Sequence, residues 1–452
     1  MPPILAVIGT TGVGKTKLAI KIAASIGGHI INGDSMQVYK ELDIVTNKPT
    51  REERASVPHH LFDFVDPLEE YSVIDYQRDA IAEISRVHAL GKIPVIVGGT
   101  SYYIQSLLWT GSTIESENID APKANGMETC HPSLANSLHA AELDRILTAT
   151  NPVHNTHDQI TAFCSEFNIF SLLKTIDPPM ANRWHENDIR KIRRSLEVYF
   201  TTGKTHSDWL LSQKMSPLTK KLRYPTCVFW LYGDKSALDP RLDSRVDQMI
   251  GQGLFNELKQ MSNKLSNSPE KSYQSPDYTR GLFQSIGFKE FDAYMKQPTE
   301  ENKQSGIERM KISTRQYARR QVQWIRNKFS PAMLKEHAAG NSAMYVLNAT
   351  DLDTFDTSCE QMGEQLAKSY LQGEPNSPSC DPELSNTLFS SGEQETDWKK
   401  YTCDVCIKQV NGTLEWNVHN KSRLHRRNVS YAESGYKRFK KPKTKEPCDL
   451  IE

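Results

Sequence analysis

Short apolar runs alternate with amphipathic segments along the first half of the chain. Three runs of strand length are continuously apolar and a fourth is shorter: residues 4–8, 93–97, 227–231 and 29–32. Continuous hydrophobicity over this length is typical of parallel strands that are buried on both faces. The segments 17–26 and 73–90 instead carry apolar side chains at helical spacing. The alternation of strand and helix predicts an α/β fold built on a parallel sheet.

This pattern changes after residue 112. Residues 133–149 and 157–167 have helical spacing and predict a helical insertion. From residue 236 onward we expect mainly helix, with a polar loop at 262–275 and a long helix at 302–328. The segment 373–397, rich in Ser, Pro, Glu and Gly, is typical of a linker.

A chain of 452 residues is too long for a single core, so we expect several domains. In chain order, the expected parts are an α/β core (1–112 and 183–350), a helical insertion (113–182), an acidic helix with a disordered linker (351–398), and a small module with a basic tail (399–445).

The net charge of zero hides a strong asymmetry. Residues 351–398 contain 11 acidic side chains and one basic one, whereas residues 399–445 contain 13 basic and 3 acidic ones. Basic tails of this kind usually meet nucleic acid. No run of 18 apolar residues occurs, and the first strand starts too early for a signal peptide, so we expect a cytoplasmic protein outside membranes. Whether some of it works in the nucleus or mitochondrion stays open.

A glycine-rich loop follows the first strand and precedes the first helix. Residues 9–16 read G-x-x-x-x-G-K-T, the pattern of a P-loop. Its backbone N–H groups, the charge of Lys15 and the helix dipole favour a di- or triphosphate, and the Thr16 hydroxyl can hold Mg²⁺. The fold we expect is therefore a P-loop NTPase-like parallel sheet, with a helical insertion and a helical C-terminal part.

Two further polar positions stand at predicted strand ends. Asp34 follows the strand at 29–32, and Thr100 follows two glycines after the strand at 93–97. Because ligands bind at the carboxyl ends of parallel strands, we expect Asp34 beside the bound phosphates. It is then a metal ligand or a base, unless it merely caps a helix. The strand before Thr100 carries no Asp of the kind that holds Mg²⁺ in ATP-hydrolysing P-loop proteins.

The C-terminal module carries a metal-binding pattern. Cys403-x2-Cys406-x12-His419-x5-His425 has the ligand set and spacing of a C2H2 zinc finger, with Trp416 and Leu414 available for a small core. The long gap between the histidines resembles RNA-associated fingers of the matrin and U1 type. A module this small needs its Zn²⁺ to fold. The basic residues 437–443 either extend an RNA contact or serve as a nuclear address.

The predicted helix at 302–328 has one basic face. Four cations fall within about 80° of one another on the helix surface, while Tyr317 lies opposite: Lys311, Arg315, Arg319 and Arg326. Such a face is either solvated or binds phosphates.

These motifs together resemble the tRNA dimethylallyltransferase (tRNA isopentenyltransferase) family, in its eukaryotic form with a C-terminal finger. The resemblance is carried by residues 9–16, 32–48, 57–61 with 66–67, 98–103, 187–198, 241–253 and 285–290. Thr10 stands where bacterial members favour Pro, which leaves the phosphate chemistry intact. The match is poorest at 120–160, so no residue is carried over from there.

The resemblance implies prenyl transfer from dimethylallyl pyrophosphate to N6 of the adenosine next to the tRNA anticodon, position 37. The catalytic residues would be Lys15, Thr16, Asp34 as the base and Thr100 as the group that positions the amine. The pyrophosphate would contact Gly9, Thr10, Thr11, Gly12, Val13, Gly14, Lys15, Thr16 and Arg245. The tRNA would contact Asp34, Ser35, Met36, Gln37, Thr100, Arg190, Arg193, Arg194, Ser285, Ile286, Gly287 and the four cations of residues 302–328. Mg²⁺ would serve the pyrophosphate site and Zn²⁺ the finger, in a protein expected to act as a monomer.

Two other functions remain open on the residues alone. The P-loop and Asp34 would also suit a kinase of small molecules or nucleotides, which consumes ATP without prenyl transfer. Alternatively, a non-enzymatic RNA-binding protein would keep the loop only as a structural relic. In that case replacing Asp34 would change no cellular function.

Overall fold

The computed structural model describes residues 1–111, 145, 168–186, 188–215, 221–266, 278, 281–338, 342–374 and 400–433. The chain divides into two compact units. The first unit comprises Met1–Met127, Asp144–Phe163 and Trp209–Glu393, and the second comprises Glu128–Leu143, Cys164–Asp208 and Gln394–Glu452. This division differs from the expected domains, because residues 183–208 belong with the finger in the second unit rather than with the core.

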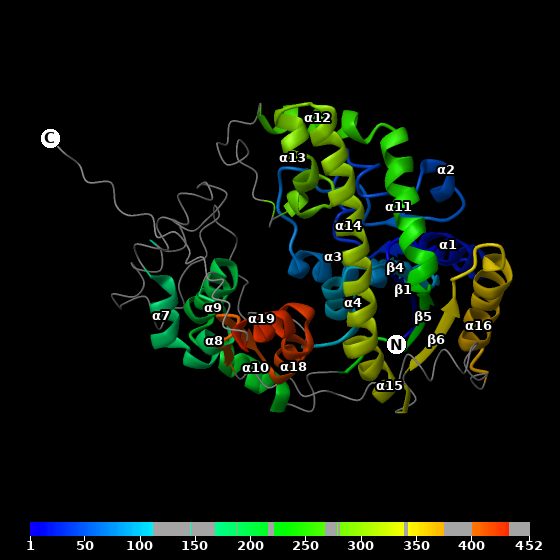
Figure 1. Cartoon of the computed structure of the whole chain (residues 1–452). Coiled ribbons are helices and arrows are strands. Elements are labelled where there is room, and N and C mark those ends of the chain that lie inside the picture. Colours follow the sequence, from blue (N-terminus) through cyan, green and yellow to red (C-terminus); the bar gives the residue numbers. More distant parts are fainter. Residues whose placement is uncertain are drawn as a thin grey trace. The chain divides into compact units, whose positions relative to one another are not determined.

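The first unit is built on a six-stranded sheet in its described part, with the order β3-β2-β4-β1-β5-β6 (Figure 1). In chain order the strands are β1 (Ile4–Gly9), β2 (His29–Asn32), β3 (His59–His60), β4 (Pro94–Gly98), β5 (Thr226–Tyr232) and β6 (Ser342–Asn348). All five neighbouring pairs are parallel. The predicted α/β class and parallel sheet are therefore confirmed.

Strand β6 corrects the expectation that the chain is mainly helical after residue 236. It pairs with β5 along its whole length, from Thr226 opposite Ser342 to Tyr232 opposite Asn348. Its residues 343–347 (Ala-Met-Tyr-Val-Leu) are continuously apolar, so the local pattern carried a strand signal that the sequence reasoning missed. The place of β6 at the sheet edge depends on its pairing with β5.

Helices cover both faces of this sheet, and β1 shows how its residues divide between them. Leu5 and Val7 pack in one apolar cluster with residues of α1 (Lys15–Ile26) and α16 (Met362–Leu371). Ile4, Ala6 and Ile8 pack in another with α3 (Val73–Ala89) and α4 (Ser101–Leu108). Both clusters are almost fully buried. The alternation of a strand thus builds a three-layer core with β1 at its centre.

Beyond β5 the first unit continues mainly as helices. They are α11 (Lys235–Gly251), α12 (Leu254–Ser266), α13 (Phe288–Lys296), α14 (Glu300–Trp324) and α15 (Ser330–Ala338). The long helix predicted at 302–328 is α14, but it ends at Trp324 in a π-helical turn, Ile325–Phe329. The side chains of Ile325 and Phe329, in that turn, are buried in the same apolar cluster as Ile4, Ala6 and Ile8 of β1. The loop expected at 262–275 is helical as far as Ser266, where α12 ends.

The second unit joins a helical part to the C-terminal finger. Its helices are α7 (Ile169–Ile176), α8 (Pro178–Arg183), α9 (Ile189–Thr202) and the start of α10 (His206–Met215). Asp177 ties them together, since it accepts the N–H groups of Met180 at 3.2 Å and Ser207 at 2.9 Å. The finger consists of the antiparallel strands β7 (Lys400–Cys403) and β8 (Lys408–Asn411), followed by α18 (Thr413–Lys421) and α19 (Arg423–Glu433).

Several expectations lie outside the described residues: the helices at 133–149 and 157–167, the basic segment 437–443, the side chain of Leu414 and almost all of the linker at 373–397. Among the described helices, none is both long and apolar enough to cross a membrane.

Candidate active site and zinc centre

The glycine-rich loop has the expected place between β1 and α1. Gly12 and Gly14 have φ angles of 74° and 91°, a conformation that L side chains rarely adopt. A Cβ atom on Gly12 would also lie 2.6 Å from Cδ2 of Leu242, on α11. Glycine is therefore required at this position both by backbone conformation and by the close approach of α11.

Lys15 is half-buried at the start of α1, and its ammonium nitrogen donates to the Thr10 carbonyl at 2.7 Å. The pKa of Lys15 is lowered to about 8: burial is the largest cause, the positive charge of Arg245 also lowers it, and the negative charge of Asp34 opposes the drop. The Thr10 hydroxyl is buried without a hydrogen-bond partner among the described residues. An anion in the loop would stabilise the Lys15 charge and give this hydroxyl an acceptor.

Asp34 lies two residues beyond the end of β2. Strand β2 does not border the P-loop strand, because β4 stands between β2 and β1. Asp34 is nevertheless close enough for the charges of Lys15 and Arg245 to act on its pKa. The turn that follows β2 brings the Asp34 carboxylate close to these two charges.

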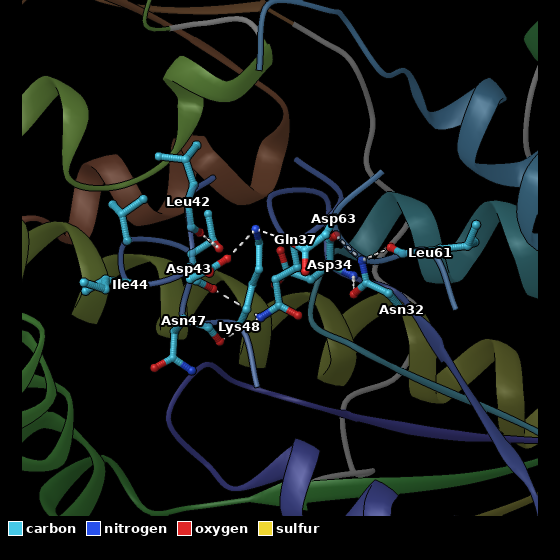
Figure 2. Close-up of polar contacts among 12 residues, drawn as sticks. Asn32, Asp34, Gln37, Leu42, Asp43, Ile44, Asn47, Lys48, Leu61 and Asp63 are labelled. Atoms are coloured by element: carbon cyan, nitrogen blue, oxygen red, sulfur yellow. Dashed lines mark hydrogen bonds and ion pairs between the residues drawn. The ribbon is translucent and has the colours of Figure 1, made fainter. Parts of the chain in front are cut away.

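The Asn32 side chain builds that turn (Figure 2). Its amide nitrogen donates to the carbonyls of Asp34 at 2.9 Å and Leu61 at 3.0 Å, and its oxygen accepts the Asp34 N–H at 2.9 Å. One Asp34 carboxylate oxygen accepts the Met36 N–H at 2.9 Å. No described helix begins here, so the helix-cap interpretation of Asp34 is not supported.

Burial raises the pKa of the Asp34 carboxyl, while the Met36 N–H and the charge of Lys15 oppose the rise. A carboxylate with a raised pKa is a stronger base than an exposed one. Asp34 is therefore suited to accept a proton from a weakly nucleophilic amine.

Thr100 follows β4 and lies beside the Asp34 turn. Its hydroxyl oxygen accepts the Ser35 N–H at 3.0 Å and can donate to the Ser35 hydroxyl at 3.3 Å. The two strand ends meet at glycines, and a Cβ on Gly98 would lie 2.2 Å from the backbone of Gly33. This close approach places Asp34, Ser35 and Thr100 in one cluster.

Helices α11 and α14 contribute three more residues. Arg245 of α11 is half-buried, and its charge acts on both Asp34 and Lys15. Gln321 of α14 accepts the Thr11 N–H at 2.9 Å and donates to the Gly99 carbonyl at 3.0 Å. Tyr317, one turn earlier, is half-buried; desolvation and the charge of Asp34 raise its pKa, while hydrogen bonds with Thr100 and Gln321 oppose the rise.

Sequence reasoning missed Tyr317 and Gln321 as site residues. The available signal was their spacing of four, on the face of α14 opposite the basic stripe. That pattern equally fits a buried core face, so it could not identify contacts with the P-loop.

Three of the four predicted tRNA-binding cations on α14 are paired with carboxylates of α11. Lys311 pairs with Asp247, Arg315 with Asp243, and Arg319 with Asp239. Arg326 lies in the π-helical turn, where its charge acts on Tyr232 instead.

The remaining predicted tRNA contacts fall in two places. Ser285, Ile286 and Gly287 form a turn before α13, where a Cβ on Gly287 would lie 2.7 Å from Val45. Arg190, Arg193 and Arg194 lie on α9 of the second unit. Arg194 pairs there with Glu197 at 3.1 Å.

The segment 36–48 is held by an internal polar network that the sequence did not reveal (Figure 2). The Gln37 amide donates to the Thr46 and Asn47 carbonyls at 3.2 and 3.0 Å. The buried Lys48 ammonium bridges Asp43 and Asp63. From α12, the Glu257 carboxylate accepts the N–H groups of Ile44 and Val45, both at 2.8 Å.

The four predicted metal ligands of the finger converge. One ligand atom from each of Cys403, Cys406, His419 and His425 lies within 4.8 Å of the others. His425 Nδ1 is 3.5 Å from each sulfur and 3.2 Å from His419 Nε2. A tetrahedral Zn²⁺ with ordinary bond lengths gives ligand separations of about 3.3–3.8 Å. The cluster can therefore hold zinc.

The immediate surroundings of this cluster support the same conclusion. The Cys406 N–H donates to Cys403 Sγ, and the Asn428 amide donates to Cys406 Sγ, both at 3.3 Å. N–H donors of this kind stabilise thiolates that bind a metal. Trp416, the predicted core residue, stacks on Tyr401 with 5.2 Å between the ring centres.

Comparison with known proteins agrees with this architecture. The model of the IPP transferase family matches residues 37–328. A relative from Schizosaccharomyces pombe named tRNA dimethylallyltransferase is 37% identical, over 95% of each chain. One of the same name from Saccharomyces cerevisiae is 34% identical, over 94% of this chain and 92% of the relative.

A solved structure extends the likeness to three dimensions. It is described as crystallographic snapshots of a eukaryotic dimethylallyltransferase acting on tRNA, and is 32% identical with a TM-score of 0.73. The match covers 96% of this chain and 98% of that one. The sequence and structural matches extend over nearly the whole chain, and the chain therefore belongs to the IPP transferase family, whose relatives are tRNA dimethylallyltransferases.

Proposed function

We propose that this protein transfers a dimethylallyl group from dimethylallyl pyrophosphate to N6 of the adenosine at position 37 of tRNA, which gives isopentenyladenosine. The observation that carries the proposal is the half-buried Asp34 carboxylate, beside Thr100 and within the electrostatic reach of Lys15 and Arg245. A base and an anion site thus adjoin, as transfer from a pyrophosphate to an amine requires. The names of the relatives support the same reaction.

The pyrophosphate would lie in the P-loop, with Lys15, the backbone N–H groups and Arg245 as its positive partners. The Thr11 N–H already donates to Gln321, which leaves the later loop N–H groups and those of the first turn of α1 for the anion. The unpartnered Thr10 hydroxyl fits this use. Mg²⁺, with Thr16 as its protein ligand, would neutralise further charge on the leaving pyrophosphate.

The reaction balances with the residues of the cluster. The N6 lone pair forms a bond with C1 of the allyl group, while the bond from C1 to the pyrophosphate oxygen breaks and its electrons leave with pyrophosphate. The proton that N6 loses goes to Asp34. Thr100, held by Ser35, would orient the amine.

The target base must leave its stack to reach Asp34. We propose that Ser35, Met36 and Gln37 contact it, because the polar network of residues 36–48 holds this segment beside Thr100. Arg190, Arg193, Arg194, the turn at 285–287 and the zinc-loaded finger would contact the tRNA elsewhere. We further propose that the protein acts as a monomer on cytoplasmic tRNA.

Incubation with unmodified tRNA, Mg²⁺ and dimethylallyl pyrophosphate, followed by mass analysis of the nucleosides, tests this function. We expect isopentenyladenosine with the wild-type protein, and a rate about 10²- to 10⁴-fold lower with Asp34→Asn. Binding of tRNA should be largely retained in the variant. ATP consumption without a prenylated nucleoside would instead establish a kinase, and full activity of Asp34→Asn would exclude Asp34 as the base.

A further inference from the structure

Helices α11 and α14 lie side by side (Figure 1), and the ion pairs between them form a regular ladder. Three carboxylates at every fourth residue of α11 face three cations at every fourth residue of α14, in antiparallel order: Asp239–Arg319, Asp243–Arg315 and Asp247–Lys311. The outer pairs have separations of 3.0 and 2.8 Å, and Arg315 donates to both oxygens of Asp243. The six charges sum to zero.

Each helix carries residues of the candidate active site two positions from the ladder. Arg245 follows Asp243, Tyr317 follows Arg315, and Gln321 follows Arg319. Two residues correspond to about 200° around a helix, so the ladder and these residues occupy opposite sides. Between them lies a small apolar cluster of Leu238, Leu242 and Ala318, of which Leu242 also packs on Gly12 of the P-loop.

The ladder is partly shielded from water. The side chains of Lys311 and Arg315 are 17% and 23% exposed, whereas Asp247 is 57% exposed. An open depression of about 530 Å³ borders it, lined by Asp239, Pro240, Asp243, Ser244, Asp247 and Arg315. A phosphate that approached Arg315 from this side would meet three carboxylates, which disfavours the use of this basic stripe as a phosphate-binding face.

We propose that the ladder is a positioning device for the pyrophosphate site. It holds α11 and α14 in one register, and thereby fixes Arg245 on one side of the P-loop and Tyr317 and Gln321 on the other. In this role Lys311, Arg315 and Arg319 act through the two helices and touch neither substrate. This inference rests on the proposed place of the pyrophosphate in the P-loop.

A charge swap tests the proposal. The variants are Asp243→Arg, Arg315→Asp and the double variant carrying both, each assayed for prenyl transfer and for tRNA affinity in the absence of the prenyl donor. We expect each single variant to raise KM for dimethylallyl pyrophosphate and to lower kcat/KM about tenfold, with tRNA affinity within about twofold of wild type. The double variant, which restores an ion pair, should recover to within about threefold.

The opposite outcomes are equally specific. If Arg315 binds a tRNA phosphate, Arg315→Asp weakens tRNA binding and makes its salt dependence shallower, Asp243→Arg strengthens binding, and the double variant recovers nothing. That pattern, or a double variant whose loss equals the product of the single losses, would overturn the proposal.

Two controls keep the test decisive. The matched swap Glu300→Lys with Lys303→Glu exchanges an ion pair at the start of α14, 3.4 Å apart, and should leave all kinetic constants unchanged. Thermal unfolding shows which variants fold; if a single variant does not, the folded double variant still tests the ladder through its activity. A wild-type protein without prenyl transfer would refute the function, whereas an active wild type with unaffected ladder variants would refute only the ladder.

Discussion

At the scale of single residues, Asp34 and Lys15 are half-buried groups whose pKa values are shifted toward each other. Burial raises the pKa of Asp34 and lowers that of Lys15 to about 8. Each charge favours the ionised form of the other, but burial dominates in both cases. The pH range in which the carboxylate and the ammonium are both charged is therefore narrowed from both sides.

This narrowed range predicts a bell-shaped pH dependence of kcat/KM. The rate should fall as the pH drops through the raised pKa of Asp34, because a protonated base accepts no proton. It should fall again above pH about 8, where Lys15 loses its charge. In Lys15→Arg, whose guanidinium stays charged, the alkaline limb should shift upward and the acid limb should remain. An alkaline limb unchanged by Lys15→Arg would exclude Lys15 as its source.

At the scale of elements, the segment 36–48 behaves as an ordered part of the site despite its lack of regular structure. The backbone N–H groups of Ile44 and Val45 donate hydrogen bonds to the Glu257 carboxylate of α12. Burial raises the pKa of Glu257, while the two N–H donors oppose the rise. A half-buried carboxylate with two charge-assisted hydrogen bonds is a strong anchor for a loop.

Replacement of this anchor should weaken both the fold and the base site. Glu257→Gln retains the shape but turns an N–H group toward one of the two donors, so we expect the free energy of unfolding to fall by about 2 kcal/mol. We also expect KM for tRNA to rise several-fold. Chemical denaturation and steady-state kinetics measure the two effects, with the exposed Glu69→Gln as control. Unchanged stability together with an unchanged KM would contradict the role of Glu257 as an anchor of the segment 36–48.

At the scale of the whole molecule, the four residues that could hold zinc all lie in the second unit. The four ligands lie between Cys403 and His425, and Lys400 at the start of the finger donates to the Ala181 carbonyl of α8 at 3.3 Å. The Lys400 ammonium also lies 5.7 Å from the centre of the Phe170 ring. The finger is thus attached to the helical part of its own unit.

Removal of zinc by a chelator should therefore destabilise the second unit more than the first. We expect hydrogen exchange to accelerate in peptides from 400–433 and, to a smaller extent, around Ala181, while peptides of β1 and β4 keep their protection. The salt dependence of tRNA binding should become shallower if the finger contacts phosphates. Unaltered exchange at 400–433 after verified metal loss would show that the finger does not need zinc to fold.

Much of this architecture could be predicted from the sequence where the signal is local. The P-loop, four strands, the long helix and the zinc ligands each follow from spacing or continuous hydrophobicity over a few residues. What could not be predicted depends on partners far away in sequence. The position of β6 requires β5, the role of Gln321 requires Thr11, and the pairing of Arg315 requires Asp243.

The basic stripe of α14 shows the limit most clearly. Its spacing predicted a common face, and three of its members do share one. The spacing of cations on one helix, however, cannot predict which carboxylates of another helix pair with them. Arg326 lies beyond α14 in the π-helical turn, where its charge acts on Tyr232, and the sequence pattern contains no sign of this turn.

The contact between Thr11 and Gln321 joins positions 310 residues apart, and it bears on the order in which the protein is made. The loop proposed to receive the pyrophosphate precedes β5, α11 and α14, which complete it from later in the chain. A nascent chain synthesised only through β4 has the glycines and Lys15 but neither Arg245 nor Gln321. We therefore expect the complete site to form only after α14 has been synthesised, and a product truncated before α14 to bind the proposed prenyl donor more weakly than the full chain.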